Sequence, residues 1–140
     1  MVSRPMAAEP SSDQQGFDGL YGLELTECTD QVVHGRVVVR DDLKQPAGVI
    51  HGGVYGAVAD ALAARGTAAA VGPEGKVAVG LSTLTTTLHP VSAGAIHATA
   101  VRRHRGRTTW VWEVEISDDG GRACAVARVT IAVRDPLRAR

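Results

Sequence analysis

Along this chain of 140 residues the spacing of hydrophobic positions changes twice, and the order of these changes predicts the architecture. Short alternating segments come first, a long alanine-rich run follows, and alternating segments return after it. The alanine-rich run predicts one long helix from Val54 to about Val71, ended by Gly72-Pro73. Before it we expect one helical turn, two strands that form a hairpin, and a polar loop, at residues 17–20, 23–27, 32–40 and 41–53.

Beyond the helix every hydrophobic run has the two-residue period of a strand. In the clearest run Trp110, Trp112, Val114 and Ile116 share one face. We therefore expect an α+β fold, in which a mostly antiparallel sheet of about five to six strands wraps around one long central helix. The four predicted strands after the helix cover residues 77–85, 96–104, 110–116 and 123–133.

Composition narrows the class of protein. A chain of this length forms one domain, predicted at residues 16–136 between a frayed N-terminus (1–15) and a tail (137–140). Lysine plus arginine equal aspartate plus glutamate at 15 each, so no net charge draws the protein to nucleic acid or to an anionic membrane. No apolar stretch reaches the roughly 18 residues of a membrane span, and the N-terminus lacks a secretion signal. We therefore expect a cytoplasmic protein.

The residues that usually bind metals or nucleotides are not arranged for either task. Cys28 and Cys124 lie far apart and indicate two free thiols. The five histidines have no metal-ligand spacing, and the chain has neither a G-x-S-x-G elbow nor a glycine-rich nucleotide loop. The sequence therefore predicts no metal and no other cofactor.

The predicted helix carries one carboxylate in an almost uncharged surface. Its only ionisable side chains are Tyr55, Asp60 and Arg65. The run is expected to be buried over most of its surface, where an ionised carboxylate is costly unless it is hydrogen-bonded or has a task. Asp60 is the first candidate catalytic residue. A structural alternative is an interfacial hydrogen bond or an ion pair with Arg65.

The helix begins after His51-Gly52-Gly53, which suggests a second piece of chemistry. The first N–H groups of a helix have no intrahelical acceptor and lie at the positive end of its dipole. The glycines let a carbonyl oxygen approach this backbone without a Cβ in the way. The pair is therefore a candidate oxyanion site for acyl transfer.

The segment A-G-V-I-H-G-G-V-Y-G-A-V-A-D, residues 47–60, resembles the hotdog-fold acyl-CoA thioesterases. The closest resemblance is to the phenylacetate-type, hydroxybenzoyl-CoA and dihydroxynaphthoyl-CoA thioesterases, and it extends through residues 104–107, 111–116 and 119–122. It implies that Asp60 is the catalytic nucleophile or general base and that Gly52 donates the oxyanion N–H.

The same resemblance assigns supporting roles. Gln45 matches the polar loop position that orients the thioester carbonyl or the water, and His51 matches a histidine that hydrogen-bonds nearby. Gly53 is placed with the substrate-binding residues. Some relatives hold the hydrolytic water with Thr or Ser one turn after the acid, where this chain has alanines. Ser82 or Thr83 on the following strand is then the candidate for that task.

The spacing of the two central residues requires a second subunit. Asp60 lies about 12 Å along the helix axis from Gly52, whereas reacting atoms must approach to roughly 3 to 3.5 Å. A two-fold homodimer with antiparallel helices brings Asp60 of one chain beside Gly52 of the other and forms two sites. The resemblance agrees with a dimer whose sheet continues across the subunits, and it implies a further pairing into a homotetramer.

Basic residues cluster between two predicted strands, at Arg102-Arg103-His104-Arg105-Gly106-Arg107. Solvated charges are common at such a junction. The functional interpretation is that Arg105 and Arg107 bind the phosphates of coenzyme A, since guanidinium groups pair well with phosphate oxygens. The cluster lacks the neighbouring aromatic residues that nucleic-acid binding requires.

Together these features predict an enzyme that hydrolyses an acyl-CoA, with an aromatic or medium-chain acyl group, to free acid and CoA. Trp110, Trp112 and Tyr55 either line an aromatic pocket or belong to the core. The alternative function is a non-catalytic module that binds or senses acyl-CoA, because the same fold serves both purposes. Release of free thiol from a panel of acyl-CoAs distinguishes the two.

Overall fold

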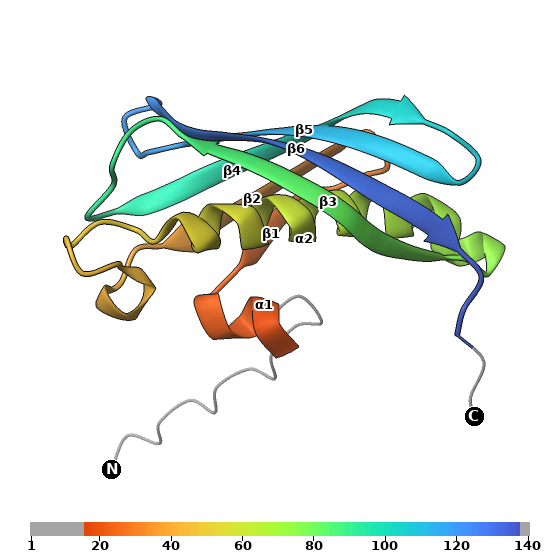
Figure 1. The fold of residues 1–140 in the computed structure, drawn as a ribbon, viewed down its shortest axis with the longest axis horizontal. Coiled ribbons are helices and arrows are strands. Elements are labelled where there is room, and N and C mark those ends of the chain that lie inside the picture. The colour runs from red at the N-terminus through yellow and green to blue at the C-terminus, as the bar shows by residue number, and fades with distance from the viewer. Residues whose placement is uncertain (1–15, 138–140) are drawn as a thin grey trace, which may run out of the picture.

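The computed structural model describes residues 16–137, in which six antiparallel strands form one sheet that curls around a central helix (Figure 1). The strand order is β1-β2-β4-β5-β6-β3, so that β1 and β3 are the edges. The central helix α2 runs from Gly52 to Val71. The strands are β1 Glu24–Cys28, β2 Val32–Val38, β3 Val77–Thr87, β4 Ala95–Arg105, β5 Thr109–Ser117 and β6 Ala123–Arg134.

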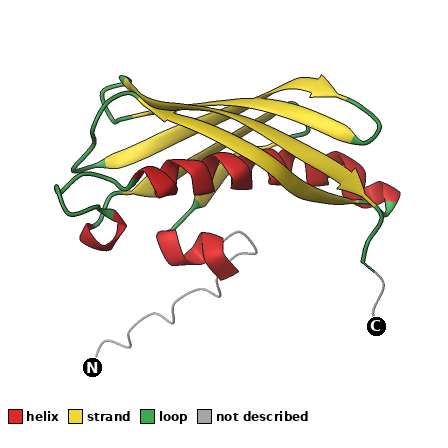
Figure 2. Ribbon diagram, in the orientation of Figure 1, coloured by secondary structure: helices red, strands yellow, loops and turns green. Residues whose placement is uncertain are grey.

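This arrangement confirms the predicted α+β architecture with one helix enclosed by a sheet (Figure 2). Short helical segments complete it: α1 at Gly16–Tyr21, η2 at Asp41–Leu43 within the predicted polar loop, and η3 at Gly72–Glu74 after α2. The predicted frayed segment 1–15 lies outside the described residues. Of the predicted tail, only Leu137 lies within them.

The core lies between α2 and the inner face of the sheet. Trp110, Trp112, Val114 and Ile116 are all at most 2% exposed, which confirms that the shared face of β5 belongs to the core. Small residues let the helix lie close to the sheet, since a Cβ on Gly66 would overlap the Trp112 ring. The Trp112 indole N–H donates to the Thr67 hydroxyl at 2.9 Å, so both polar groups are satisfied.

The remaining candidate for an aromatic pocket, Tyr55, and the two thiols can also be located. Tyr55 is 1% exposed and packs in the core, as do Trp110 and Trp112. Cys28 is exposed and Cys124 is buried, and both are free, as expected. Of the two alternatives for Tyr55, Trp110 and Trp112, the structure therefore supports the one that places them in the core.

The helix begins two residues earlier than predicted, at Gly52, because His51 serves as its N-cap. The His51 Nδ1 accepts a hydrogen bond from the Gly53 N–H at 2.9 Å, which satisfies one of the free donors of the first turn. The sequence signal for this start was weak, since a histidine is an uncommon cap.

β3 differs most from its predicted form. The strand predicted at residues 77–85 is confirmed, but β3 is an edge strand on which Val79, Leu81 and Leu84 are 46%, 56% and 73% exposed. A β-bulge between Gly80 and Ser82 breaks the alternation, so the alternating residues before and after it do not share a face.

Candidate functional site

An open strip of α2, formed by Gly52, Gly56 and Asp60, faces the edge strand β3. A Cβ added to Gly52 would lie 3.7 Å from the Thr87 hydroxyl oxygen, and one added to Gly56 would lie 3.6 Å from that of Thr85. Gly52 and Asp60 thus lie along one side of the helix. Because β3 has no strand beyond it within the described residues, this side of the helix opens to the edge of the sheet.

The Asp60 carboxylate lies directly against β3, where a Cβ on Gly80 would approach Asp60 Oδ1 to 2.5 Å. Asp60 itself is exposed, although the run around it was expected to be buried over most of its surface. The remaining alanine-rich surface of α2 is mostly buried, as predicted. The carboxylate is therefore the only charged group among the exposed residues of α2.

Partial burial raises the pKa of the Asp60 carboxyl group, and the nearby Asp18 carboxylate raises it further. Asp18 belongs to α1, which packs on the outer side of α2. It accepts a hydrogen bond from the Tyr21 hydroxyl at 2.9 Å and pairs with Arg65 at 3.4 Å. No local sequence pattern indicates this cluster, since α1 and α2 are distant in the chain. Arg65, the alternative partner predicted for Asp60, thus pairs with Asp18 on the side of α2 that faces α1.

The start of α2 is held by the folded-back polar loop. Lys44 and Ile50 form an isolated β-bridge, and the His51 N–H donates to the Leu43 carbonyl at 2.9 Å. These contacts bring the loop of Gln45 against the start of the helix. The Gln45 Oε1 accepts from the Ala47 N–H at 2.7 Å, which fixes the side-chain amide within its own loop.

The two glycine N–H groups at the helix start have different partners. The Gly53 N–H already donates to His51 Nδ1. Gly52 is the first residue of the helix, where an N–H has no intrahelical acceptor, and no hydrogen bond of this N–H is found within residues 16–137. The backbone therefore leaves Gly52, and not Gly53, free to donate to a substrate oxygen.

The strand register separates the two candidate water-binding residues. Thr83 pairs with Val129, whose side chain is fully buried, whereas Ser82 pairs with Thr130. Paired residues of antiparallel strands project to the same side of the sheet, so Thr83 faces α2 and Ser82 faces away from it. Thr85 and Thr87, which sequence reasoning missed, also face the helix beside Gly56 and Gly52. A run of alternating threonines after Gly80 was the available signal.

The two candidate phosphate-binding arginines lie at the other end of the sheet, near the end of α2. Arg105 pairs with Asp30 at 2.9 Å, and its guanidinium carbon lies 4.7 Å from the centroid of the Trp110 ring. Arg107 lines a separate surface hollow at the start of β3. Arg105 therefore has a structural task, and Arg107 faces an open space.

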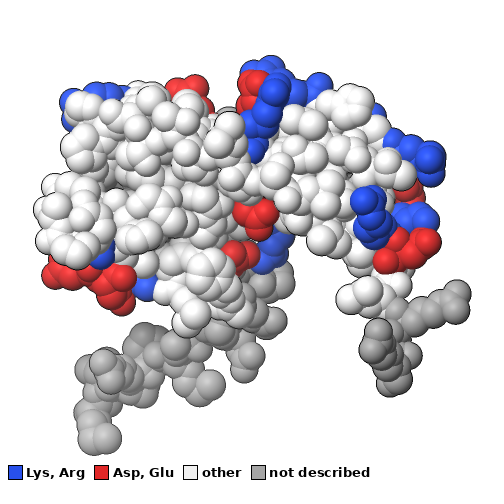
Figure 3. All heavy atoms as spheres, viewed as in Figure 1, with Lys and Arg blue, Asp and Glu red and all other residues white. Residues whose placement is uncertain are grey.

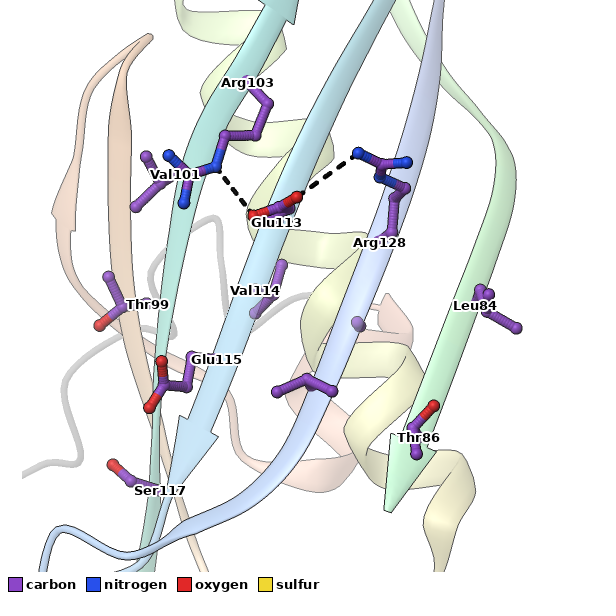
Figure 4. A pocket seen from close by; sticks show the side chains of 12 residues that line it. Leu84, Thr86, Thr99, Val101, Arg103, Glu113, Val114, Glu115, Ser117 and Arg128 are labelled. Carbon is purple, nitrogen blue, oxygen red and sulfur yellow. Dashed lines mark hydrogen bonds and ion pairs between the residues drawn. The ribbon is translucent and has the colours of Figure 1, made fainter. Parts of the chain in front are cut away.

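A larger hollow of about 600 Å³ lies on the outer face of the sheet (Figure 4). Glu113 pairs there with Arg103 at 2.9 Å and with Arg128 at 3.4 Å. The hollow contains no residue of α2, and Val114 is the only one of its lining residues taken from the inner row of β5. It is thus separated from Asp60 and Gly52 by the sheet.

Two further observations concern the kind of site. Residues 16–137 contain no group of three or more His, Cys, Asp or Glu side chains arranged to hold a metal ion. In the same part of the chain no helix has the length and apolar character needed to cross a membrane. Any chemistry at the open strip therefore has to be argued from the carboxylate and from the backbone and hydroxyl donors.

Comparison with known proteins assigns this chain to a family. Residues 47–125 match the model of the thioesterase superfamily. A 1,4-dihydroxy-2-naphthoyl-CoA hydrolase of Listeria monocytogenes is 31% identical over 85% of this chain and 96% of its own length. The chain therefore belongs to the thioesterase superfamily, has the hotdog fold, and is a thioester hydrolase.

Solved structures agree with this assignment. A mutant thioesterase of Pseudomonas aeruginosa, with Gln replaced by Ala, has a TM-score of 0.84 at 29% identity and covers 90% of each chain. A Staphylococcus aureus thioesterase was solved as a Gln-to-Ala mutant, with a TM-score of 0.80 at 28% identity, over 83% of this chain and 96% of that one. The same protein was also solved as a Glu-to-Ala mutant.

Proposed function

We propose that the protein hydrolyses acyl-CoA thioesters at a site shared by two subunits. The observation that carries this proposal is the strip of Gly52, Gly56 and Asp60, which is open only toward the edge strand β3. In one chain the carboxylate is about 12 Å along the axis from the Gly52 N–H, which is too far for both to act on one carbonyl. A second copy across β3 removes this difficulty.

The place of a two-fold axis follows separately from α2 and from β3, and the two results agree. Midway between Gly52 and Asp60 on the helix is Gly56. The corresponding neighbours on β3 are Thr87 and Gly80, and their midpoint lies between Thr83 and Leu84. Since Gly56 faces Thr85, both midpoints lie at nearly the same level. An axis there would pair β3 with its copy, continue the sheet, and cover the exposed Val79, Leu81 and Leu84.

In the proposed reaction the thioester carbonyl oxygen accepts a hydrogen bond from the Gly52 N–H at the positive end of α2. Asp60 of the partner subunit attacks the carbonyl carbon or takes a proton from the attacking water. When Asp60 attacks, the C–S bond breaks, the thiolate of CoA leaves, and water hydrolyses the resulting anhydride to the free acid and Asp60. When water attacks, breaking of the same bond releases the thiolate and the free acid directly. Thr83 faces α2 near the same level and is the better placed of the two candidates for holding the water.

Gln45 is proposed to orient the carbonyl or the water through its side-chain amide, and His51 to fix the first turn through its bond to Gly53. The Staphylococcus aureus relative supports Gln45 and Asp60 as two residues of one site. The Gln and Glu that were replaced in it lie fifteen residues apart, as do Gln45 and Asp60. The acyl group stays proposed as aromatic or medium-chain, and the pairing of dimers into a tetramer is likewise a proposal.

The test is release of free thiol from aromatic and aliphatic acyl-CoAs by the wild type and by Asp60→Asn. We expect the variant to lose about 10²- to 10⁴-fold in kcat, because an amide neither attacks nor accepts a proton, while the oligomer remains folded. Glu115→Gln on the outer face makes the same chemical change and should retain full activity. Wild-type turnover by Asp60→Asn would refute the assignment, and tight binding without thiol release would favour the acyl-CoA-binding module.

A further inference from the structure

The short helix α1 lies on the side of α2 that faces away from the sheet (Figure 1), and it holds one carboxylate firmly in place. The Asp18 carbonyl oxygen accepts a hydrogen bond from the N–H of the buried Leu23 at 3.1 Å. The Asp18 carboxylate accepts one from the Tyr21 hydroxyl at 2.9 Å. Gly22, with φ of +79°, makes the turn between these residues. Asp18 is therefore fixed against α2 by its backbone and by its side chain.

The only basic residue of α2, Arg65, pairs with this carboxylate. The guanidinium group of Arg65 lies 3.4 Å from the Asp18 carboxylate, and both side chains are partly buried, with 30% and 22% of their surface exposed. For Asp60, in contrast, no hydrogen bond or ion pair occurs within residues 16–137. The carboxylate that is proposed to react therefore has no counter-ion in the described part of its own chain.

The charged and titratable groups around Asp60 come mainly from α1. β3, against which Asp60 lies, has no ionisable side chain along its length. α1 contributes Asp18 and the buried Tyr21, and the pKa of the Tyr21 hydroxyl is raised by burial first and then by Asp18 and Asp60. Arg65 and the Cys28 thiol of β1, which lies within range of the Arg65 charge, complete the group. Figure 3 shows that acidic and basic atoms meet near the middle of this face, with uncharged atoms on either side.

A second negative charge beside a reacting carboxylate changes its chemistry. In a partly desolvated place two like charges repel more strongly than in bulk water, so each disfavours the ionised form of the other. The Asp18 carboxylate thereby adds to the effect of burial and raises the pKa of Asp60. A carboxylate with a higher pKa binds a proton or an acyl carbon more strongly. It is therefore a better general base and a better nucleophile near neutral pH.

We propose that Asp18 is a positioning residue of the reaction: held by Tyr21 and Arg65, its carboxylate acts on Asp60 of the same subunit and makes Asp60 a stronger base or nucleophile. This inference rests on the proposed function and adds to it a residue of α1 that acts only through Asp60. The alternative is that Asp18 only fastens α1 to α2. In that case the reaction would depend on its hydrogen bonds and not on its charge.

The experiment measures how kcat/KM for thiol release from an acyl-CoA depends on pH. Activity requires the ionised Asp60, so the rate falls as the pH drops through the pKa of this group. Asp18→Asn removes the charge, while the amide oxygen still accepts hydrogen bonds from Tyr21 and Arg65. We expect the acid limb of the profile to move to lower pH, because Asp60 loses a like-charged neighbour. The plateau should fall roughly two- to tenfold, because Asp60 becomes a weaker base.

Two further variants separate charge from structure. Asp18→Glu keeps the charge and should hold the acid limb closer to its wild-type position than Asp18→Asn does. Glu115→Gln removes one negative charge from the outer face and should leave both limb and plateau unchanged. The partner subunit's His51, which the proposed dimer brings toward Asp60, is present in all of these variants and does not explain a difference between them. An acid limb that stays in place in folded Asp18→Asn, whether or not the rate falls, would overturn the proposal.

If the wild type hydrolyses no thioester, the proposed function fails, and the action of Asp18 on Asp60 is then measured directly. Titration followed by carboxyl ¹³C NMR gives the pKa of Asp60, whose signal is identified by its absence in Asp60→Asn. A lower pKa of Asp60 in Asp18→Asn than in the wild type supports the proposed influence of Asp18, and an unchanged pKa overturns it.

Discussion

Gly52 occupies the first position of α2, where the backbone N–H lacks an acceptor in the helix. Its neighbour Gly53 has the same freedom in the sequence, yet His51 uses that donor. Asp60 is only partly covered by its own chain. This partial burial and the nearby Asp18 carboxylate both raise the pKa of its carboxyl group. At the scale of residues, function depends on which polar groups the fold leaves without partners.

A proline at position 52 tests the oxyanion donor. Proline is well tolerated at the first helical position and has no N–H, and His51, with ψ of 133°, already has the extended conformation required before proline. We expect Gly52→Pro to retain the helix while kcat falls by about 10²- to 10³-fold. Circular dichroism checks the helix and thiol release measures kcat. Full activity in a folded variant would show that another group binds the oxyanion.

At the scale of elements, the fold places a helix of small residues against a sheet with one free edge. Gly66 allows α2 to approach Trp112, and the Thr67–Trp112 hydrogen bond fixes the depth of that contact. β3 has the opposite role, since it is a long edge strand with exposed apolar residues and open backbone groups to which another strand can pair. The helix thus anchors the core at its C-terminal half and presents its chemistry at its N-terminal half.

Two Gly→Ala substitutions separate packing from helix propensity. At Gly66 a Cβ would overlap the Trp112 ring and lie 2.8 Å from Val33 Cγ2, so we expect Gly66→Ala to lower the free energy of unfolding by about 1–3 kcal/mol. Gly56 lies inside the helix, where an added Cβ would make only an ordinary contact of 3.6 Å with the Thr85 hydroxyl oxygen, so Gly56→Ala should raise it by about 0.5–1 kcal/mol. Urea denaturation measures both, and a stabilised Gly66→Ala would contradict the tight contact.

At the scale of the whole molecule, the described chain contains every proposed catalytic group but does not bring them together. Asp60 lies beside Gly80 in the first half of β3, whereas Gly52, preceded in the chain by Gln45 and His51, lies beside Thr87 at the other end. A two-fold dimer would join the first set of one subunit to the second set of its partner. Activity would then require assembly.

Mixed dimers test this division. Asp60→Asn and Gly52→Pro each disable both sites of a homodimer, but a heterodimer of the two has one site with an intact Gly52 and an intact Asp60. Random assembly of equal amounts should therefore restore about one quarter of the wild-type activity per chain. Co-expression with two affinity tags followed by thiol release provides the measurement. Mixed samples that stay as inactive as the separate variants would place the whole site within one chain.

The sequence by itself determined the elements, because their signals are local. Hydrophobic period separates α2 from the strands, and Gly72-Pro73 marks the end of the helix. The spacing of Gly52 and Asp60 along one helix likewise follows from its rise alone. The family resemblance, carried by residues 47–60, was confirmed by the superfamily match at residues 47–125.

Only the tertiary structure decided which of several equivalent residues face the site. The bulge after Gly80 turns Thr83 toward α2 and Ser82 away from it, and a local pattern does not reveal where a ladder slips by one residue. Arg105 and Arg107 differ only because Asp30, distant in the chain, lies beside one of them. Long-range pairing, which brings remote residues into contact, made these choices.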